Sequence, residues 1–178
     1  MRCFIALEVG EEVKKKCLAY IATLKEMGFR GKWVEKENLH ITLFFLGEIS
    51  EEQMKRTAVM VKNAPYDPFS LRINRLGYFQ KHDKPSVIWL GFKKSDPLQE
   101  LYLAMKKELE AKGHQAFGNN YMPHLTLGRI KTAPEDWNDR LKVMPIKNMR
   151  ITDTVLSLKH STLTKNGPIY KVLETKMF

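Results

Sequence analysis

The sequence contains the same short pattern twice, and this repeat constrains the fold more than any other feature. His40-Ile41-Thr42-Leu43 recurs as His124-Leu125-Thr126-Leu127, 84 positions further along a chain of 178 residues. Each copy alternates polar and apolar residues inside an apolar segment, which predicts a β-strand. Because successive side chains of a strand point to opposite faces, the histidine and the threonine of each copy share a face. The sequence therefore predicts two strands that each present an imidazole and a hydroxyl.

The remaining pattern predicts a single α+β domain, residues 1–178, built from two pseudo-symmetric lobes. Each lobe is expected to have an antiparallel sheet with helices outside and to contribute one His-x-Thr strand to a central cleft. Periodicity and breakers predict strands at 2–9, 32–34, 39–46, 69–73, 87–92, 124–130, 149–158 and 170–174, and helices at 11–27, 50–63, 96–113 and 134–143.

Local signals refine these boundaries. Residues 50–53 read as a capping box that opens a helix, and Asp96-Pro97 reads as a cap with proline at the first helical position. Residues 77–85 are expected to be irregular. Asn166-Gly167 predicts a hairpin turn.

Composition limits the possible partners and compartments. Lys and Arg number 30 against 20 Asp and Glu, a formal net charge of +10, which favours a polyanion such as nucleic acid but is also compatible with simple solubility. No apolar run approaches the length of a membrane span, so no membrane partner is expected. Cys3 and Cys17 both lie in apolar patterns and are expected to pack as small hydrophobic residues, which favours a reducing cytoplasm. We expect a monomer.

Of the five histidines, only His40 and His124 share the same sequence setting; the other three, His82, His114 and His160, are expected at the surface. Metal binding does not suit the pair, because no Cys, Asp or Glu accompanies either motif at ligand spacing and threonine is a poor ligand. No serine or cysteine nucleophile motif is present. General acid and base catalysis at phosphorus fits best, with one imidazole as the base and the other as the acid.

The neighbours of the two histidines suggest how a phosphate would be held. The hydroxyls of Thr42 and Thr126 would bind its non-bridging oxygens, and Arg129 could add a guanidinium. Arg129 follows His124 by five positions, and this odd offset leaves the direction of its side chain open. Phe44 or Tyr121 could stack on a nucleobase. For Phe44, core packing is an equally open alternative.

Several segments together resemble one known family. They comprise residues 2–7, the signature 33–47 around the first motif, the strand 87–91, the signature 123–129 around the second motif, and the closing segment 161–170. With these segments the sequence resembles the 2H phosphoesterase superfamily, and within it the bacterial and archaeal RNA 2′,3′-cyclic phosphodiesterases, once called 2′-5′ RNA ligases.

The resemblance implies a bilobal fold with pseudo-two-fold symmetry, no metal and no cofactor. It implies hydrolysis of a 2′,3′-cyclic phosphate, on RNA or on a nucleotide, to a 2′-phosphate, with His40 as the proton donor and His124 as the proton acceptor. The residues alone leave these two roles interchangeable. They also leave open 2′-5′ ligation as the reverse reaction, a non-catalytic RNA- or nucleotide-binding module, and a basic RNA-binding protein whose His-x-Thr strands are structural.

Overall fold

The computed structural model describes residues 1–64, 67, 69–115, 117–118, 121–152, 154–165 and 167–176. The strands are β1 (Arg2–Glu8), β2 (Arg30–Trp33), β3 (His40–Glu48), β4 (Leu71–Lys81), β5 (Lys84–Phe92), β6 (His124–Thr132), β7 (Met149–Ile151), β8 (Val155–Thr164) and β9 (Gly167–Lys176). The helices are α1 (Glu11–Glu26), α2 (Glu51–Lys62), α3 (Asp96–Ala111) and α4 (Trp137–Val143), with a short 3₁₀ turn at Lys36–Asn38.

The strands form one antiparallel sheet in the order β7-β4-β5-β6-β3-β1-β8-β9, and β2 also pairs with β6. The predicted α+β class, with antiparallel strands and outer helices, is confirmed. The two sheets expected for the two lobes are joined, however, because β3 and β6 pair through Ile41 and Leu125 at the centre. Both side chains are fully buried, so the two cores meet at this point.

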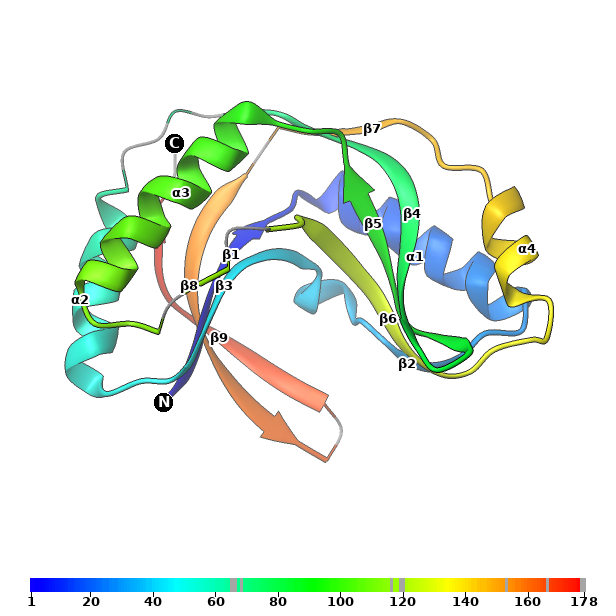
Figure 1. Ribbon diagram of the computed structural model, residues 1–178, viewed down its shortest axis with the longest axis horizontal. Helices are drawn as coiled ribbons and strands as arrows, with labels where there is room; N and C mark the ends of the chain where they lie inside the picture. The colour runs from blue at the N-terminus through cyan, green and yellow to red at the C-terminus, as the bar shows by residue number, and fades with distance from the viewer. Residues whose placement is uncertain are drawn as a thin grey trace.

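The two lobes exchange their covering helices (Figure 1). The lobe that carries His40 contains β3, β1, β8 and β9 and is covered by α2 and α3, whereas α1 and α4 lie on the other side, with the lobe that carries His124. Helix α3 follows β5 in the chain, yet its Tyr102 ring stacks on Phe44 of β3 at 4.6 Å between centroids. Likewise α1 follows β1 but contacts the other lobe, where the Lys147 N–H donates to Tyr20 Oη at 2.9 Å. Helices α1 and α3 therefore each pack on the lobe opposite to the strand that they follow, so the chain crosses between the two lobes.

Local sequence signals explain most helix boundaries. The capping box is present: the Gln53 N–H donates to Ser50 Oγ and the Ser50 N–H donates to Gln53 Oε1, each at 3.1 Å. Helix α3 starts at Asp96 as expected, but the N-cap is Ser95 rather than Asp96, and the Ser95 side chain accepts from the Leu98 N–H. Cys17 lies on the buried face of α1, and Cys3 is buried too, which confirms both predictions for the cysteines.

The expectation of an irregular segment at 77–85 is wrong. Strand β4 continues to Lys81 and pairs with β5 along most of its length. Gly77 is not a chain breaker but a site of close approach, since a Cβ there would lie 2.2 Å from Trp89 Cη2. The predicted strand 149–158 is also split into β7 and β8. Asn166 of the predicted hairpin turn lies outside the described residues, whereas Gly167 begins β9 with φ +138°.

None of the described helices is long and apolar enough to cross a bilayer.

Replacing Gly77 with alanine is expected to destabilise the fold by about 1–3 kcal/mol, because the added methyl group overpacks against the Trp89 ring. Urea denaturation measures this loss. Gly118→Ala is the matched control, because a Cβ at Gly118 meets nothing within 4 Å. Equal stability of the two variants would show that Trp89 does not lie against Gly77.

Candidate functional site

The two His-x-Thr motifs meet where β3 and β6 pair. The paired residues of these strands are Ile41 and Leu125, and continuing this antiparallel register places His40 across from Thr126 and Thr42 across from His124. The histidines and threonines therefore alternate around a pseudo-two-fold axis. The sequence repeat thus becomes a spatial repeat on one face of the sheet.

A β-bulge follows the threonine in each strand. In the β1–β3 pair, Ile5 aligns with Phe44 and Ala6 with Thr42, so Leu43 is an extra residue. In the β5–β6 pair, Ile88 aligns with Gly128 and Trp89 with Thr126, so Leu127 is an extra residue in the same way. A bulge reverses the alternation of the residues beyond it. The first residue to face the cleft beyond each bulge therefore lies at an odd offset, five positions after the histidine.

The two bulges decide the direction of the side chains that follow them. Arg129 turns to the cleft, as the phosphate-binding prediction requires, and Phe45 occupies the equivalent position in β3. Phe44 points instead into the core, where it is 1% exposed. Of the two alternatives that the sequence leaves open for Phe44, base stacking and core packing, the structure therefore supports core packing. The apolar run at 43–46 does not alternate, but such a run is equally compatible with a strand buried on both faces, so the sequence did not reveal the bulge.

Tyr121 also takes a structural position. Its ring stacks on Tyr102 at 4.4 Å between centroids, and its hydroxyl donates to the Thr42 carbonyl oxygen at 2.8 Å. One face of the Tyr121 ring is therefore occupied by Tyr102. Tyr121 thus holds the β3 backbone at Thr42 and does not line the cavity between the lobes, which gives base stacking by its ring no support.

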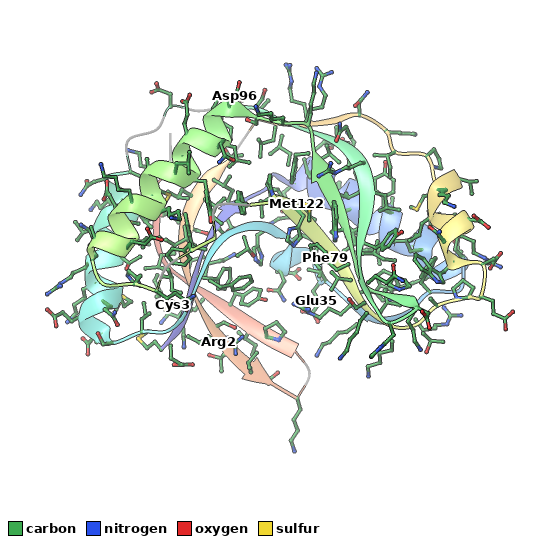
Figure 2. The ribbon with its side chains drawn as sticks, in the orientation of Figure 1. Arg2, Cys3, Glu35, Phe79, Asp96 and Met122 are labelled. Atoms are coloured by element: carbon green, nitrogen blue, oxygen red, sulfur yellow. The ribbon has the colours of Figure 1, made fainter. Side chains whose placement is uncertain are left out.

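A cavity of about 500 Å³ lies between the lobes, lined by His40, Thr42, Thr126 and Arg129 among others. It continues outward to the first residues of β1 and to the β8–β9 hairpin. Figure 2 shows Arg2 and Cys3 on one side of this region and Phe79 and Met122 on the other. His124 lies beyond the cavity lining, where its ring packs edge-on to Phe79 at 5.1 Å and near Trp89 at 5.8 Å.

Both imidazoles are oriented by the same contact. His40 Nδ1 lies 2.7 Å from the Asn38 carbonyl oxygen, and His124 Nδ1 lies 2.9 Å from the Met122 carbonyl oxygen, in each case two residues earlier. A carbonyl only accepts, so Nδ1 carries the proton and Nε2 is left as the reactive atom. Thr42 Oγ1 lies 3.1 Å from His40 Nε2 and can donate to it. The site therefore holds two Nε2 atoms in defined orientations.

A packed wall surrounds His40. Its ring lies 5.0 Å from the Phe4 ring and 5.4 Å from the Tyr170 ring. Behind these rings Lys159, which is 4% exposed, pairs with Glu8 at 2.8 Å, and Glu8 Oε1 also accepts from Ser157. The sequence did not reveal this pair, because its members lie at positions 8 and 159 and meet only through neighbouring strands.

This environment disfavours the charged imidazole. Burial, together with the positive charge of Lys159, lowers the pKa of His40 to about 4, against the opposing effects of the Asn38 carbonyl and Glu8. The charge of His124 adds to the lowering, so the two imidazoles sense each other. Burial raises the pKa of Tyr170, while the charges of Arg129 and Arg2 oppose that shift. Arg129 and Arg2 thus act on Tyr170 from different strands of the cleft.

The expected surface position of the remaining histidines is correct only in part. His82 is exposed in the β4–β5 turn, and His160 is half-buried on β8. His114 is 9% exposed and its Nε2 lies 3.0 Å from Thr57 Oγ1, so its surface prediction is wrong. The segment after α3 folds back onto α2 and covers it, which the sequence pattern did not indicate.

No group of three or more His, Cys, Asp or Glu that could hold a metal ion is gathered among the described residues. The groups that line the cavity are instead one imidazole, two hydroxyls and a guanidinium, and the second imidazole, that of His124, lies across the strand pair from Thr42. Such a set can bind an oxyanion and move protons on either side of it.

Comparison with known proteins identifies the family of the chain. The family model described as LigT like Phosphoesterase matches residues 7–89. A protein of Thermotoga maritima named RNA 2′,3′-cyclic phosphodiesterase is 38% identical over 175 residues, which cover 97% of this chain and 93% of that protein. The chain therefore belongs to the LigT-like phosphoesterase family, and the predicted resemblance to 2H phosphoesterases is confirmed.

Two further proteins extend the comparison. An Archaeoglobus fulgidus protein, also named RNA 2′,3′-cyclic phosphodiesterase, is 33% identical and covers 97% of this chain and 98% of its own length. The crystal structure of TT0787 from Thermus thermophilus superposes with a TM-score of 0.80 at 30% identity, covering 99% of this chain and 97% of that one. The similarity therefore spans both lobes.

The low pKa of His40 has a consequence for folding that can be measured. In the unfolded chain this histidine gains a proton near pH 6.5, but in the folded protein only near pH 4. Between these two pH values the unfolded chain binds a proton at His40 that the folded protein does not bind. The free energy of unfolding is therefore highest above pH 6.5 and falls as the pH decreases toward 4. From pH 7 to pH 5 the wild type should lose about 2 kcal/mol more than His40→Gln.

Urea denaturation at the two pH values tests this difference. His160→Gln is the control and should follow the wild type. If the wild type and His40→Gln lost the same stability, His40 would have an ordinary pKa.

Proposed function

We propose that the protein is an RNA 2′,3′-cyclic phosphodiesterase that hydrolyses a terminal 2′,3′-cyclic phosphate to a 2′-phosphate. One observation carries the proposal: two imidazoles, each tied through Nδ1 to a carbonyl, stand on a symmetric strand pair with two threonines and Arg129. The full-length relatives from Thermotoga maritima and Archaeoglobus fulgidus bear the name of this activity. Residue types, geometry and relatives thus favour the same reaction.

The reaction assigns a role to each group. The hydroxyls of Thr42 and Thr126 and the Arg129 guanidinium bind the non-bridging oxygens and stabilise the charge that develops on them. His124 Nε2 takes a proton from a water molecule, whose oxygen attacks phosphorus. His40 Nε2 gives a proton to the 3′-oxygen as the P–O3′ bond breaks. The products are a 3′-hydroxyl and a 2′-phosphate, and no metal ion takes part.

A proton donor must carry a proton when the reaction occurs, whereas the low pKa of His40 leaves its ring neutral in the free protein at neutral pH. Burial and Lys159 keep His40 neutral in the empty cleft. A bound phosphate brings negative charge next to the ring, and an opposite charge nearby favours the protonated form. His40 therefore takes up its proton when the substrate binds. The same burial then makes the protonated ring a strong acid toward the leaving oxygen.

We also propose that the whole chain acts as one domain, because each lobe supplies one histidine and one threonine to the reaction. The substrate class is RNA ending in a cyclic phosphate, in keeping with a net charge of +10. The two buried free cysteines support a cytoplasmic location. The described exposed large apolar residues are distributed over several elements, which supports a monomer.

Loss of either imidazole should reduce hydrolysis of 2′,3′-cyclic AMP by about 10²–10⁴-fold, the usual contribution of one general acid or base. The His40→Ala/His124→Ala double variant should be little worse than either single variant, because the two groups act in one step. Phosphorus NMR follows turnover and identifies 2′-AMP as the product.

His160→Ala is the matched control, since His160 does not line the cavity, and it should keep wild-type turnover. Wild-type protein that leaves 2′,3′-cyclic AMP intact would contradict the proposed activity. Near-full turnover in either single variant would contradict the proposed mechanism.

Binding of the product should protonate His40. Imidazole nitrogen NMR is expected to show a neutral, Nδ1-protonated His40 ring at pH 6 in the free protein. With saturating 2′-AMP the same ring should become doubly protonated, because the phosphate charge raises its pKa.

His124→Ala keeps the His40 signals and allows them to be assigned. A His40 ring that stays neutral in the complex would contradict the uptake of a proton in response to the phosphate charge.

A further inference from the structure

The direct contact between β3 and β6 is short. Among the described residues the two strands pair at Ile41 and Leu125 and at no further position. Thr42 and His124 lie just past this pair, at one end of the contact, and His40 lies at the other end. The position of Thr42 relative to the second lobe therefore depends on contacts other than the ladder between these two strands.

The two ends of the contact are supported differently. Beyond His40, the segment that precedes β3 pairs with β6 as strand β2, and the Val34 N–H donates to the Leu127 carbonyl oxygen at 2.9 Å. Beyond Thr42, the segment that precedes β6 reaches β3 with a side chain, since Tyr121 Oη donates to the Thr42 carbonyl oxygen at 2.8 Å. A backbone ladder thus supports one end, whereas the other end has a hydroxyl that a single substitution can remove.

The Thr42 carbonyl lies where the ladder between β1 and β3 is interrupted. Leu43 is the extra residue of the β3 bulge, so the peptide that joins Thr42 to Leu43 falls at the irregular point of the strand. Gln115 binds the far side of the same bulge, because its Nε2 donates to the Phe45 carbonyl oxygen at 3.0 Å. The segment before β6 therefore holds the bulge from both sides, and Tyr121 holds the side next to the Thr42 hydroxyl.

The Tyr121 hydroxyl is itself fixed by the packing of its ring. The ring stacks on Tyr102 with 4.4 Å between centroids and 6° between planes, and Tyr102 stacks in turn on Phe44 at 4.6 Å. The stack and the hydroxyl thus contact β3 at Phe44 and at Thr42. Burial raises the pKa of Tyr121, so its hydroxyl keeps its proton and donates to the carbonyl throughout the neutral pH range.

We infer that Tyr121 is a positioning residue for the reaction, whose hydroxyl holds the β3 bulge so that the Thr42 hydroxyl stays in place to bind the reacting phosphate. This inference rests on the proposed function, in which Thr42 binds a non-bridging oxygen of that phosphate. Thr42 Oγ1 also lies 3.1 Å from His40 Nε2, so a displaced hydroxyl loses both partners. A displacement of about 1 Å in a catalytic site can reduce turnover by about 10²-fold.

Tyr121→Phe tests this role, because it keeps the ring stack and removes the hydroxyl. The kcat/KM for 2′,3′-cyclic AMP should fall by about 5–100-fold, where the upper value corresponds to a displacement of about 1 Å. Unchanged kcat/KM in Tyr121→Phe would overturn the inference.

Tyr102→Phe is the matched control. It removes a hydroxyl from the next ring of the same stack, and this hydroxyl donates to the Gly118 carbonyl oxygen at 2.9 Å rather than to β3. The control should keep the wild-type kcat/KM. An equal loss in Tyr102→Phe and Tyr121→Phe would show that the stack as a whole matters and not the bond to Thr42, which would also overturn the inference.

A double-variant cycle with Thr42→Val shows whether Tyr121 acts through the Thr42 hydroxyl. Thr42→Val removes that hydroxyl and keeps the shape of the side chain. In this background Tyr121→Phe should lower kcat/KM by no more than about twofold, because two changes that remove the same interaction are not additive. The same fold loss in both backgrounds would mean that Tyr121 acts on another group, and the inference would be wrong.

A failure of the proposed function gives a different result. If folded wild-type protein leaves 2′,3′-cyclic AMP intact, the proposed activity is wrong, and calorimetric binding of inorganic phosphate then tests Tyr121. Tyr121→Phe should bind phosphate more weakly than the wild type and Tyr102→Phe, and it should not weaken binding further in the Thr42→Val background. Equal phosphate affinity of Tyr121→Phe and the wild type would overturn the positioning role.

Discussion

The pairing of Ile41 with Leu125 is the contact on which the rest of the molecule depends. It joins two lobes that are otherwise built from separate sets of strands, and it brings the two His-x-Thr motifs together. Its apolar side chains are fully buried, so its position is set by the hydrophobic alternation of both strands. A shift of one residue would turn the histidines and threonines into the core, which makes the register a requirement for the site.

The paired bulges turn a simple repeat into a site with two different halves. Each bulge sends the residue five positions after the histidine into the cleft: Phe45 from one strand and Arg129 from the other. One lobe thus offers an apolar ring and the other a guanidinium, while the histidines and threonines are the same. The fold keeps the two-fold symmetry of the histidines and threonines, and it adds asymmetry at Phe45 and Arg129.

The surroundings of the two histidines differ in a similar way. His40 is enclosed by Phe4 and Tyr170, with the buried Lys159–Glu8 pair behind them, whereas His124 lies against Phe79 and Trp89. A buried ammonium close to His40 and the aromatic wall around it make its charged form costly. Two equivalent positions in the sequence therefore have different surroundings, which supports the separate roles proposed for the two histidines.

The sequence by itself determined the class of the fold, most of its strands and helices, the pair of histidines with their threonines, and the family. These features follow from local alternation and from short motifs, which are complete within a few residues. The directions of Phe44, Phe45 and Arg129 were decided only in the tertiary structure, because a bulge depends on the partner strand. The same holds for the joined sheet, the exchanged helices and the Lys159–Glu8 pair, whose members are distant in the chain and meet only when neighbouring strands align.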